Sequence, residues 1–252
     1  MYADLPRPTI FAHRGAKKYA PENTLAAFRL AVDQGAPAIE LDAKLTADGE
    51  VVVHHDLTLE RTTNGTGSLN THTLAALKQL DAGSHFGPAF AGEPIPTLAE
   101  VFEAVGQQIF INVELTNYAS PKDALPEKVV ALVKHYGLEQ RVMFSSFNRL
   151  ALQSAQRLMP EIPLGLLAFP YLLGAPARSW IGRRWVDYQA LHPALMDAKP
   201  RLIRKAHKWG KRVHVYTVNL RHDMLRLFQA GVDGIFTDDP LLALQVLREL
   251  GK

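Results

Sequence analysis

The sequence contains no cysteine among its 252 residues. Disulfide bonds and thiolate metal ligands are therefore excluded, and any metal site must use oxygen or nitrogen ligands. Long apolar runs are also lacking, because glycine and proline interrupt the stretch from Leu164 to Ala175, which is too short to span a bilayer. Residues 1–8 carry no apolar segment of signal-peptide length. We therefore expect a cytoplasmic protein without stable membrane insertion.

Several functional motifs are absent as well. The sequence has no G-x-x-x-x-G-K-[ST] loop, no G-x-G-x-x-G fingerprint and no G-x-S-x-G elbow. Nucleotide cradling and serine hydrolase chemistry are therefore without support. No block of like charges suggests a nucleic-acid tail, so we expect no nucleic-acid partner. A net charge of +3 and a pI near 9.1 favour a small anionic substrate.

The composition of the sequence and the order of its apolar runs predict a single domain, residues 1–252, with an α/β fold. Hydrophobic residues make up 47% of the chain, and no linker or change of composition divides it. Short β-rich runs alternate with amphipathic helical stretches, which predicts a (β/α)8 barrel. The expected strands are Thr9–His13, Ala38–Asp42, Ile109–Glu114, Val142–Ser145, Pro163–Leu167, Ala190–Leu191, Val213–Thr217 and Gly234–Thr237.

The expected helices alternate with the strands, except that a long insertion follows strand two. They are Thr24–Gln34, Leu98–Val105, Leu125–Tyr136, Arg149–Arg157, Lys199–Trp209, Asp223–Gln229 and Pro240–Leu250. After strand two, Val51–His54 predicts an additional short strand, and roughly residues 56–96 predict an insertion with a helical run near Leu74–Leu80. Such an insertion would shape the substrate pocket if it lies at the carboxyl ends of the strands.

Polar residues fall at the carboxyl ends of successive expected strands, where barrel active sites are built. These residues are His13, Glu40, Asp42, Glu114, Ser145, Ser146, His192, Thr217, Asn219 and Asp238. Glu40 and Asp42 alternate on one strand, so their side chains share a face about 6.6 Å apart at the α-carbons. Two such anions repel unless a cation lies between them, and Glu114 supplies a third carboxylate. One divalent cation, Mg²⁺ or Ca²⁺, fits this oxygen-only set, although ion pairs with Arg14 or Lys44 are an alternative explanation.

Two histidines are candidates for acid and base catalysis. His13 ends the first strand and precedes Arg14, whose planar guanidinium suits a phosphate oxygen. His55 ends the short strand after the Val-Val-Val run, whereas His54 points the other way. Arg61, in the insertion, is either a phosphate contact or, as we favour, part of an ion pair. These residue types in this order indicate metal-assisted attack on a phosphate ester.

The ordered motifs resemble the glycerophosphodiester phosphodiesterase family, and most closely its cytosolic bacterial members. The resemblance covers nearly the whole chain. Its segments are His13-Arg14-Gly15, Pro21-Glu22-Asn23-Thr24, Ile39-Glu40-Leu41-Asp42, Thr46-Ala47-Asp48-Gly49, His55-Asp56, Leu59-Glu60-Arg61-Thr62-Thr63, Asn112-Val113-Glu114, Ser145-Ser146-Phe147, Tyr216-Thr217-Val218-Asn219, Gly231-Val232-Asp233-Gly234 and Thr237-Asp238.

The resemblance implies a (β/α)8 barrel that hydrolyses small-molecule glycerophosphodiesters to sn-glycerol 3-phosphate and an alcohol. It also implies a role for each matching site residue: Glu40, Asp42 and Glu114 bind the metal, His13 and His55 are acid and base, and Arg14 holds the phosphate.

One position departs from the family pattern. The family usually has a lysine two residues after the third carboxylate, where this chain has Thr116. Lys44 is a possible substitute for the missing charge. Two alternative functions follow. One is a lysophospholipase D-type hydrolase using the apolar Leu166–Leu173 loop and the segment that contains Trp180 and Trp185. The other is a non-catalytic barrel that binds phosphodiesters.

Overall fold

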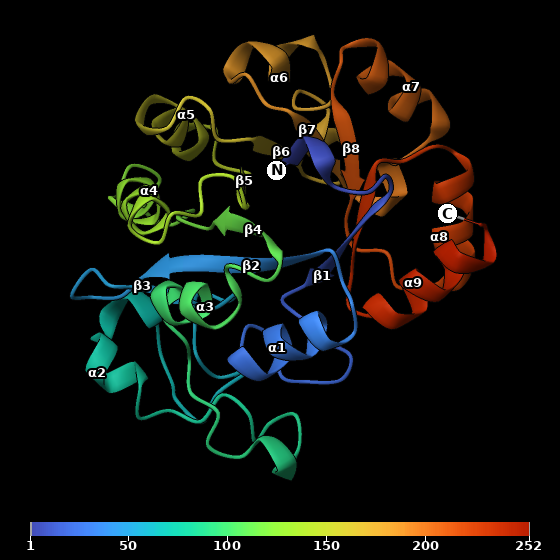
Figure 1. The fold of residues 1–252 in the computed structure, drawn as a ribbon. Coiled ribbons are helices and arrows are strands. Elements are labelled where there is room, and N and C mark those ends of the chain that lie inside the picture. The colour runs from blue at the N-terminus through green and yellow to red at the C-terminus, as the bar shows by residue number, and fades with distance from the viewer. Residues whose placement is uncertain (1, 252) are drawn as a thin grey trace.

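Eight parallel strands close into a barrel in the computed structural model, which describes residues 2–251 (Figure 1). β1 completes the closure by pairing with β2 on one side and β9 on the other. The short strand β3 is antiparallel to β2. The strands are β1 (Thr9–His13), β2 (Ala38–Leu45), β3 (Val51–Val53), β4 (Phe110–Leu115), β5 (Val142–Ser146), β6 (Leu164–Ala168), β7 (Ala190–Pro193), β8 (Arg212–Val215) and β9 (Gly234–Thr237). The predicted (β/α)8 barrel is confirmed.

Helices surround the barrel and bury one face against the strands (Figure 1). Local signals set where they begin: Thr24 accepts the Ala27 N–H at the start of α1, and Thr97 and Glu100 form a capping box at α3. The helices are α1 (Leu25–Asp33), α2 (Leu74–Leu77), α3 (Leu98–Val105), α4 (Leu125–His135), α5 (Arg149–Leu158), α6 (Trp180–Trp185), α7 (Pro200–Lys208), α8 (Arg221–Gln229) and α9 (Pro240–Glu249). Each helix expected from the sequence forms, with small shifts at its ends.

Strand β2 is longer than the sequence predicted. The expected strand ended at Asp42, but pairing with β3 through Ala43, Lys44 and Leu45 extends it by three residues. Lys44 is therefore held in a strand. An antiparallel partner supplied by the following residues stabilises the extension, and the alternation of β2 alone does not reveal it.

The residues between β3 and α3 pack beside the barrel, in the teal and green part of Figure 1. Together with Val52 of β3 they form a small apolar cluster, whose other members are Leu59, Leu69, Leu77, Ala82 and Ile95. No helix within residues 2–251 is long and apolar enough to cross a membrane.

The inside of the barrel is apolar at one level and polar at the next. Phe11 and Phe236 stack with ring centroids 4.7 Å apart and belong to a buried cluster with Phe110. Since side chains alternate along a strand, the same face two residues further on carries His13 and Asp238. The aromatic rings thus form a buried layer beneath the polar site.

His192 lies within β7 and is fully buried, so its expected place among the residues at the barrel mouth is wrong. Its Nε2 is 3.2 Å from Nδ1 of His214 on β8. The His192 ring lies so close to Gly165 that a Cβ there would come within 2.3 Å of it. Strand β7 continues to Pro193, which places His192 below the strand end.

Candidate active site

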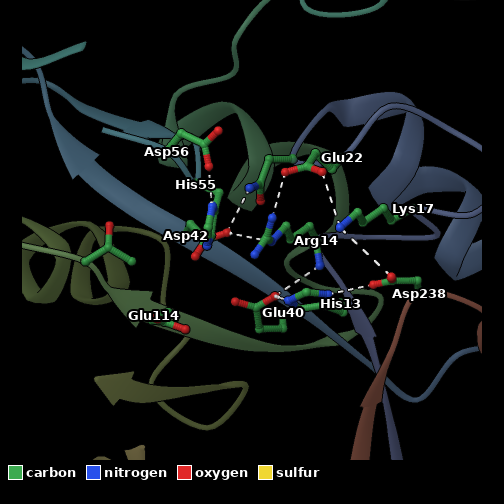
Figure 2. Close-up of polar contacts among 12 residues, drawn as sticks. His13, Arg14, Lys17, Glu22, Glu40, Asp42, His55, Asp56, Glu114 and Asp238 are labelled. Carbon is green, nitrogen blue, oxygen red and sulfur yellow. Dashed lines mark hydrogen bonds and ion pairs between the residues drawn. The ribbon is translucent and has the colours of Figure 1, made fainter. Parts of the chain in front are cut away.

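Three carboxylates from two neighbouring strands converge inside the barrel mouth (Figure 2). Strand register places Asp42 opposite Glu114, and His13 opposite Glu40. Glu40, Asp42 and Glu114 each offer an oxygen atom, and these atoms lie within 4.8 Å of one another. The acidic cluster expected from the sequence therefore forms, and register explains why residues 72 positions apart, Asp42 and Glu114, meet.

The electrostatics of this cluster are unfavourable for three anions. Burial and repulsion by Asp42 and Glu114 raise the pKa of Glu40 well above its ordinary value. Burial and the Asp42 charge also raise the pKa of Glu114 to about 7. Burial alone would raise the pKa of Asp42, but Arg14 and other neighbours outweigh it and hold this pKa below its ordinary value. A cation among the three oxygens would relieve the repulsion.

The turn after β1 provides the acidic cluster with a hydrogen-bond donor, a backbone N–H group. Arg14 and Gly15 adopt left-handed backbone conformations, with φ of 56° and 84°. A Cβ at Gly15 would come within 2.7 Å of Ala27, so α1 packs against the turn only because this residue is glycine. The turn directs the Arg14 backbone N–H to Glu40 Oε2 at 3.0 Å. The His-Arg-Gly motif therefore shapes the backbone as well as supplying side chains.

The Arg14 guanidinium lies between two acidic groups. Its Nη1 is 2.8 Å from Glu22 Oε1, and its Nε is 3.3 Å from Asp42 Oδ2. The ion pair weighed against metal binding is thus present at Asp42. It does not remove the repulsion at Glu40, whose pKa stays raised.

His13 is held by a carboxylate from the other end of the chain. Its Nδ1 is 2.6 Å from Asp238 Oδ1, and Asn219 donates to Asp238 Oδ2 at 2.9 Å. The His13 Nε2 faces Glu40, 4.0 Å from Oε2. Burial lowers the pKa of His13, although Asp238 opposes the shift. Only the position of Asp238 at a strand end signalled this role in the sequence.

His55 has a carboxylate partner of its own. Its Nδ1 is 2.6 Å from Asp56 Oδ1, and Asp56 is in turn bound by Arg61 through Nε at 2.6 Å. Arg61 Nη2 also donates to Glu22 Oε1 at 2.7 Å, which links the residues after β3 to the start of α1. Arg61 is thus an ion-pair residue, as favoured from the sequence. His55 is 42% exposed at its side chain, against 15% for His13.

One cavity of about 290 Å³ brings these groups together. Its polar lining includes His13, Arg14, Glu40, His55 and Glu114, and its apolar lining includes Phe147, Leu167, Tyr216 and Phe236. The two histidines therefore share a cavity with two of the three carboxylates, Glu40 and Glu114. His54 is buried elsewhere, with Nε2 3.1 Å from the Thr58 carbonyl oxygen.

Lys44 lies next to this cavity. Its Nζ donates to Thr116 Oγ1 at 2.8 Å, and both residues line an adjoining hollow of about 320 Å³. Burial lowers the pKa of Lys44, while the charges of Asp42 and Glu114 oppose the shift. The ammonium group thus lies in the field of the acidic cluster but faces the neighbouring hollow.

The residues present fit a hard divalent cation. Carboxylate oxygens are the donors that Mg²⁺ and Ca²⁺ prefer. Within residues 2–251, the buried Oδ1 atoms of Asn23 and Asn112 also have no hydrogen-bond partner. Asn23 Nδ2 donates to Asp42 Oδ2 at 2.9 Å, and Asn112 lines the cavity. Both amide oxygens are thus available to a ligand beside the cluster.

Comparison with known proteins adds an independent observation. The profile of the glycerophosphoryl diester phosphodiesterase family matches residues 13–242. A glycerophosphodiester phosphodiesterase of Caldanaerobacter subterraneus subsp. tengcongensis is 42% identical over 243 residues, covering 96% of this chain and 98% of that protein. The structure of an Oleispira antarctica phosphodiesterase in complex with the product sn-glycerol-3-phosphate has a TM-score of 0.89 and 34% identity, with 98% of each chain covered. A glycerophosphodiester phosphodiesterase of Agrobacterium tumefaciens has a TM-score of 0.81 and 33% identity, covering 94% of this chain and 99% of that one.

Proposed function

The chain belongs to the glycerophosphoryl diester phosphodiesterase family, and we propose that it hydrolyses small glycerophosphodiesters with a divalent cation and two histidines. The products would be sn-glycerol 3-phosphate and an alcohol. The observation that carries this proposal is a cluster of three carboxylates, with oxygens within 4.8 Å of one another, beside two carboxylate-bound imidazoles. Two of the three carboxylates, Glu40 and Glu114, line the same cavity as both imidazoles. The related structure that contains sn-glycerol-3-phosphate supports the choice of substrate.

Glu40, Asp42 and Glu114 would hold the cation, Mg²⁺ or Ca²⁺. When bound, the ion would neutralise negative charge on the phosphodiester oxygens. Arg14 would hold the phosphate from the adjoining side, because it lines the cavity and carries a fixed guanidinium fork. We place Lys44 in a supporting electrostatic role at the edge of the site.

His13 and His55 would carry out the two proton transfers. An oxygen nucleophile attacks phosphorus, one imidazole takes its proton, and the bond from phosphorus to the alcohol oxygen breaks. The other imidazole donates a proton to the departing alcohol. Asp238 and Asp56 each bind the Nδ1 side of one ring, so Nε2 is the nitrogen that would exchange protons with the substrate.

The test is release of glycerol 3-phosphate from glycerophosphocholine and glycerophosphoethanolamine after chelation, and again with Mg²⁺ or Ca²⁺ restored. We expect release only with a divalent ion. His13→Asn and Glu40→Gln should abolish it. The matched controls are His222→Asn and Glu161→Gln, which change the same residue types at exposed positions outside the cavity.

Activity that survives chelation would contradict the role of the cation. Activity that survives His13→Asn would contradict the role of that histidine. No release by folded protein with either substrate and either ion would favour the non-catalytic, phosphodiester-binding alternative.

A second candidate function is lysophospholipase D-type hydrolysis, which an apolar path beside the cavity favours. Phe147, which lines the cavity, stacks on Phe169 with ring centroids 4.2 Å apart. Phe169 leads to the exposed Leu172 and Leu173. An acyl chain could lie along this path while the phosphodiester occupies the site. Equal or faster turnover of lysophosphatidylcholine than of glycerophosphocholine would support this function, and no turnover of the lysolipid would exclude it.

A further inference from the structure

One segment, about a sixth of the chain, carries a strong excess of positive charge. Between residues 169 and 212 the sequence has ten lysine and arginine residues and two aspartates, a net charge of +8, whereas the whole chain has +3. This segment begins after β6 and reaches the start of β8, so it includes α6 and α7, which are neighbours in Figure 1. The basic residues are therefore concentrated on one sector of the barrel.

The same segment exposes an unusual number of apolar side chains. Of the 14 large hydrophobic side chains that are exposed within residues 2–251, six lie between 169 and 181. Leu172 and Leu173 are 88% and 80% exposed, which is close to full exposure. Single exposed apolar residues need no explanation, but a contiguous group marks an interaction site. The six are Phe169, Tyr171, Leu172, Leu173, Trp180 and Ile181.

The exposed loop is held in place by specific contacts. Arg178 Nη1 donates to the Phe169 carbonyl oxygen at 2.6 Å, and Arg178 also binds the Tyr171 carbonyl oxygen and Asp197. Asp197 accepts the Tyr171 N–H at 2.9 Å. Gly174 allows the tight fold, since a Cβ there would come within 1.8 Å of the Phe169 carbonyl oxygen. These contacts fix a loop whose leucines point outward.

Basic and aromatic side chains alternate next to this loop. Arg184 lies over the Trp180 ring at 5.8 Å, while Arg183 and Lys205 lie over Trp209 at 5.0 and 4.8 Å. Lys205 Nζ is also 3.4 Å from the Arg178 carbonyl oxygen, which joins α7 to the loop. We refer to residues 169–185 together with the basic side chains of α7 as the basic–apolar surface.

We propose that the basic–apolar surface docks on an anionic lipid bilayer. Leu172 and Leu173 would enter the headgroup region, and the arginines and lysines of α6 and α7 would contact anionic headgroups. Exposed leucine and tryptophan beside arginine and lysine is the composition of segments that lie at a membrane interface. Basic residues near an anionic bilayer each add to the attraction.

Charge distinguishes this partner from a second copy of the chain. Two basic–apolar surfaces placed face to face would bring together two patches of like charge, which disfavours self-association. A nucleic acid would satisfy the charge but would leave the two leucines without an apolar partner. An anionic bilayer satisfies both features.

The basic–apolar surface is in contact with a residue that lines the active-site cavity. Phe169 belongs to the basic–apolar surface, and its ring stacks on Phe147, which lines the cavity with Glu114. Docking would therefore hold the opening of the cavity beside the bilayer. The docking itself does not depend on the proposed function, because it is measured without substrate.

The experiment is sedimentation of the full chain with vesicles of phosphatidylcholine alone and of phosphatidylcholine mixed with phosphatidylglycerol. We expect binding to the mixed vesicles, weaker binding at high salt, and little binding to phosphatidylcholine alone. Replacing two arginines in Arg183→Gln/Arg184→Gln should weaken binding about 30-fold. Leu172→Ser/Leu173→Ser should weaken it about 10-fold or more.

Matched controls alter the same residue types at other exposed positions. Arg29→Gln/Arg157→Gln lowers the net charge equally, and Leu158→Ser/Leu241→Ser removes two exposed leucines. Both controls should bind the mixed vesicles like the wild type. Circular dichroism verifies that every variant is folded.

Three outcomes would overturn the proposal. One is no sedimentation with the mixed vesicles. Another is that duplex DNA displaces the protein from the vesicles and binds it with undiminished affinity in the leucine variant, which would assign the surface to nucleic acid. The third is a dimer in light scattering that Leu172→Ser/Leu173→Ser converts to a monomer, which would assign it to a second copy.

Discussion

Lys44 on β2 donates a 2.8 Å hydrogen bond to Thr116, the residue that follows β4. The Thr116 hydroxyl in turn donates to the Ala43 carbonyl oxygen at 2.7 Å, so it is fixed by the backbone and holds the ammonium group in place. The Lys44 ammonium group and the Thr116 hydroxyl are thus brought together by the pairing of β2 with β4 and are joined by one contact.

We predict that Lys44→Met lowers kcat by about 100-fold, because it removes a positive charge that interacts with the acidic cluster. Thr116→Val keeps the charge and loses only its hydrogen bond, so the decrease should be smaller. The double variant Lys44→Met/Thr116→Lys should regain part of the lost activity by placing a lysine directly after β4. Steady-state kinetics on glycerophosphocholine measure all three. An unchanged kcat in Lys44→Met would show that the charge has no part in the reaction.

A second prediction concerns the partner of His13. Asp238→Asn should lower kcat about 100-fold or more with little change in KM, since the imidazole loses the carboxylate that orients it. The neighbouring Asp239→Asn is the control. Asp239 caps α9 by accepting the Leu242 N–H at 3.1 Å and also binds Lys18, so this variant should lose stability but keep its kcat. Equal kcat losses in the two variants would contradict a positioning role for Asp238.

A third prediction links metal binding to stability. Without a cation, Glu40→Gln should be more stable than the wild type by about 1 kcal/mol, because it removes one anion from a buried, repulsive cluster. With Mg²⁺ or Ca²⁺ the order should reverse, since the wild type, with three carboxylates, gains more binding energy than the variant. Urea unfolding in chelator and in excess metal ion tests both halves. A variant that is less stable than the wild type in chelator would show that Glu40 is a structural residue.

A fourth prediction concerns acid sensitivity of the fold. Burial lowers the pKa of His192 to about 3, and burial with the neighbouring His192 holds the pKa of His214 well below 6.5. The unfolded chain takes up protons at both rings below pH 6.5, whereas the folded chain does not. The stability from the neutral rings is therefore complete above pH 6.5 and falls as the pH drops toward 3, by about 1.4 kcal/mol per pH unit for each ring.

His214→Gln tests this directly. Between about pH 5 and 6, its unfolding free energy should depend on pH less steeply than that of the wild type, by about 1.4 kcal/mol per pH unit. His222→Gln, which alters an exposed histidine, should leave the slope unchanged. The slope is the readout, because His214→Gln also changes the packing against Phe11.

Much of the site was predictable because it follows from local pattern. The alternation of Glu40 and Asp42 on one strand, and the position of Glu114 at the end of the next barrel strand, placed three carboxylates together. In the structure, the register between β2 and β4 places the three carboxylates in the expected cluster. His13 and His55 were found in the same way, as polar residues that end apolar runs.

What could not be predicted depends on contacts between distant segments. The extension of β2 to Leu45 requires β3, and the link between Lys44 and Thr116 follows from that extension. The burial of His192 below the end of β7 could not be predicted from the sequence of that strand, because pairing with the neighbouring strand β6 determines where β7 ends. The partnership of His13 with Asp238 depends on closure of the barrel.

That partnership spans 225 positions of the chain, since β1 carries the imidazole and the carboxylate follows β9. During synthesis, Asp238 leaves the ribosome 225 residues after His13. A growing chain therefore cannot orient its histidine until β9 and the residue after it have been made, however much of the barrel has already folded. Chains that are cut short before the last strand would contain all three carboxylates of the acidic cluster but would lack Asp238, the carboxylate that orients His13.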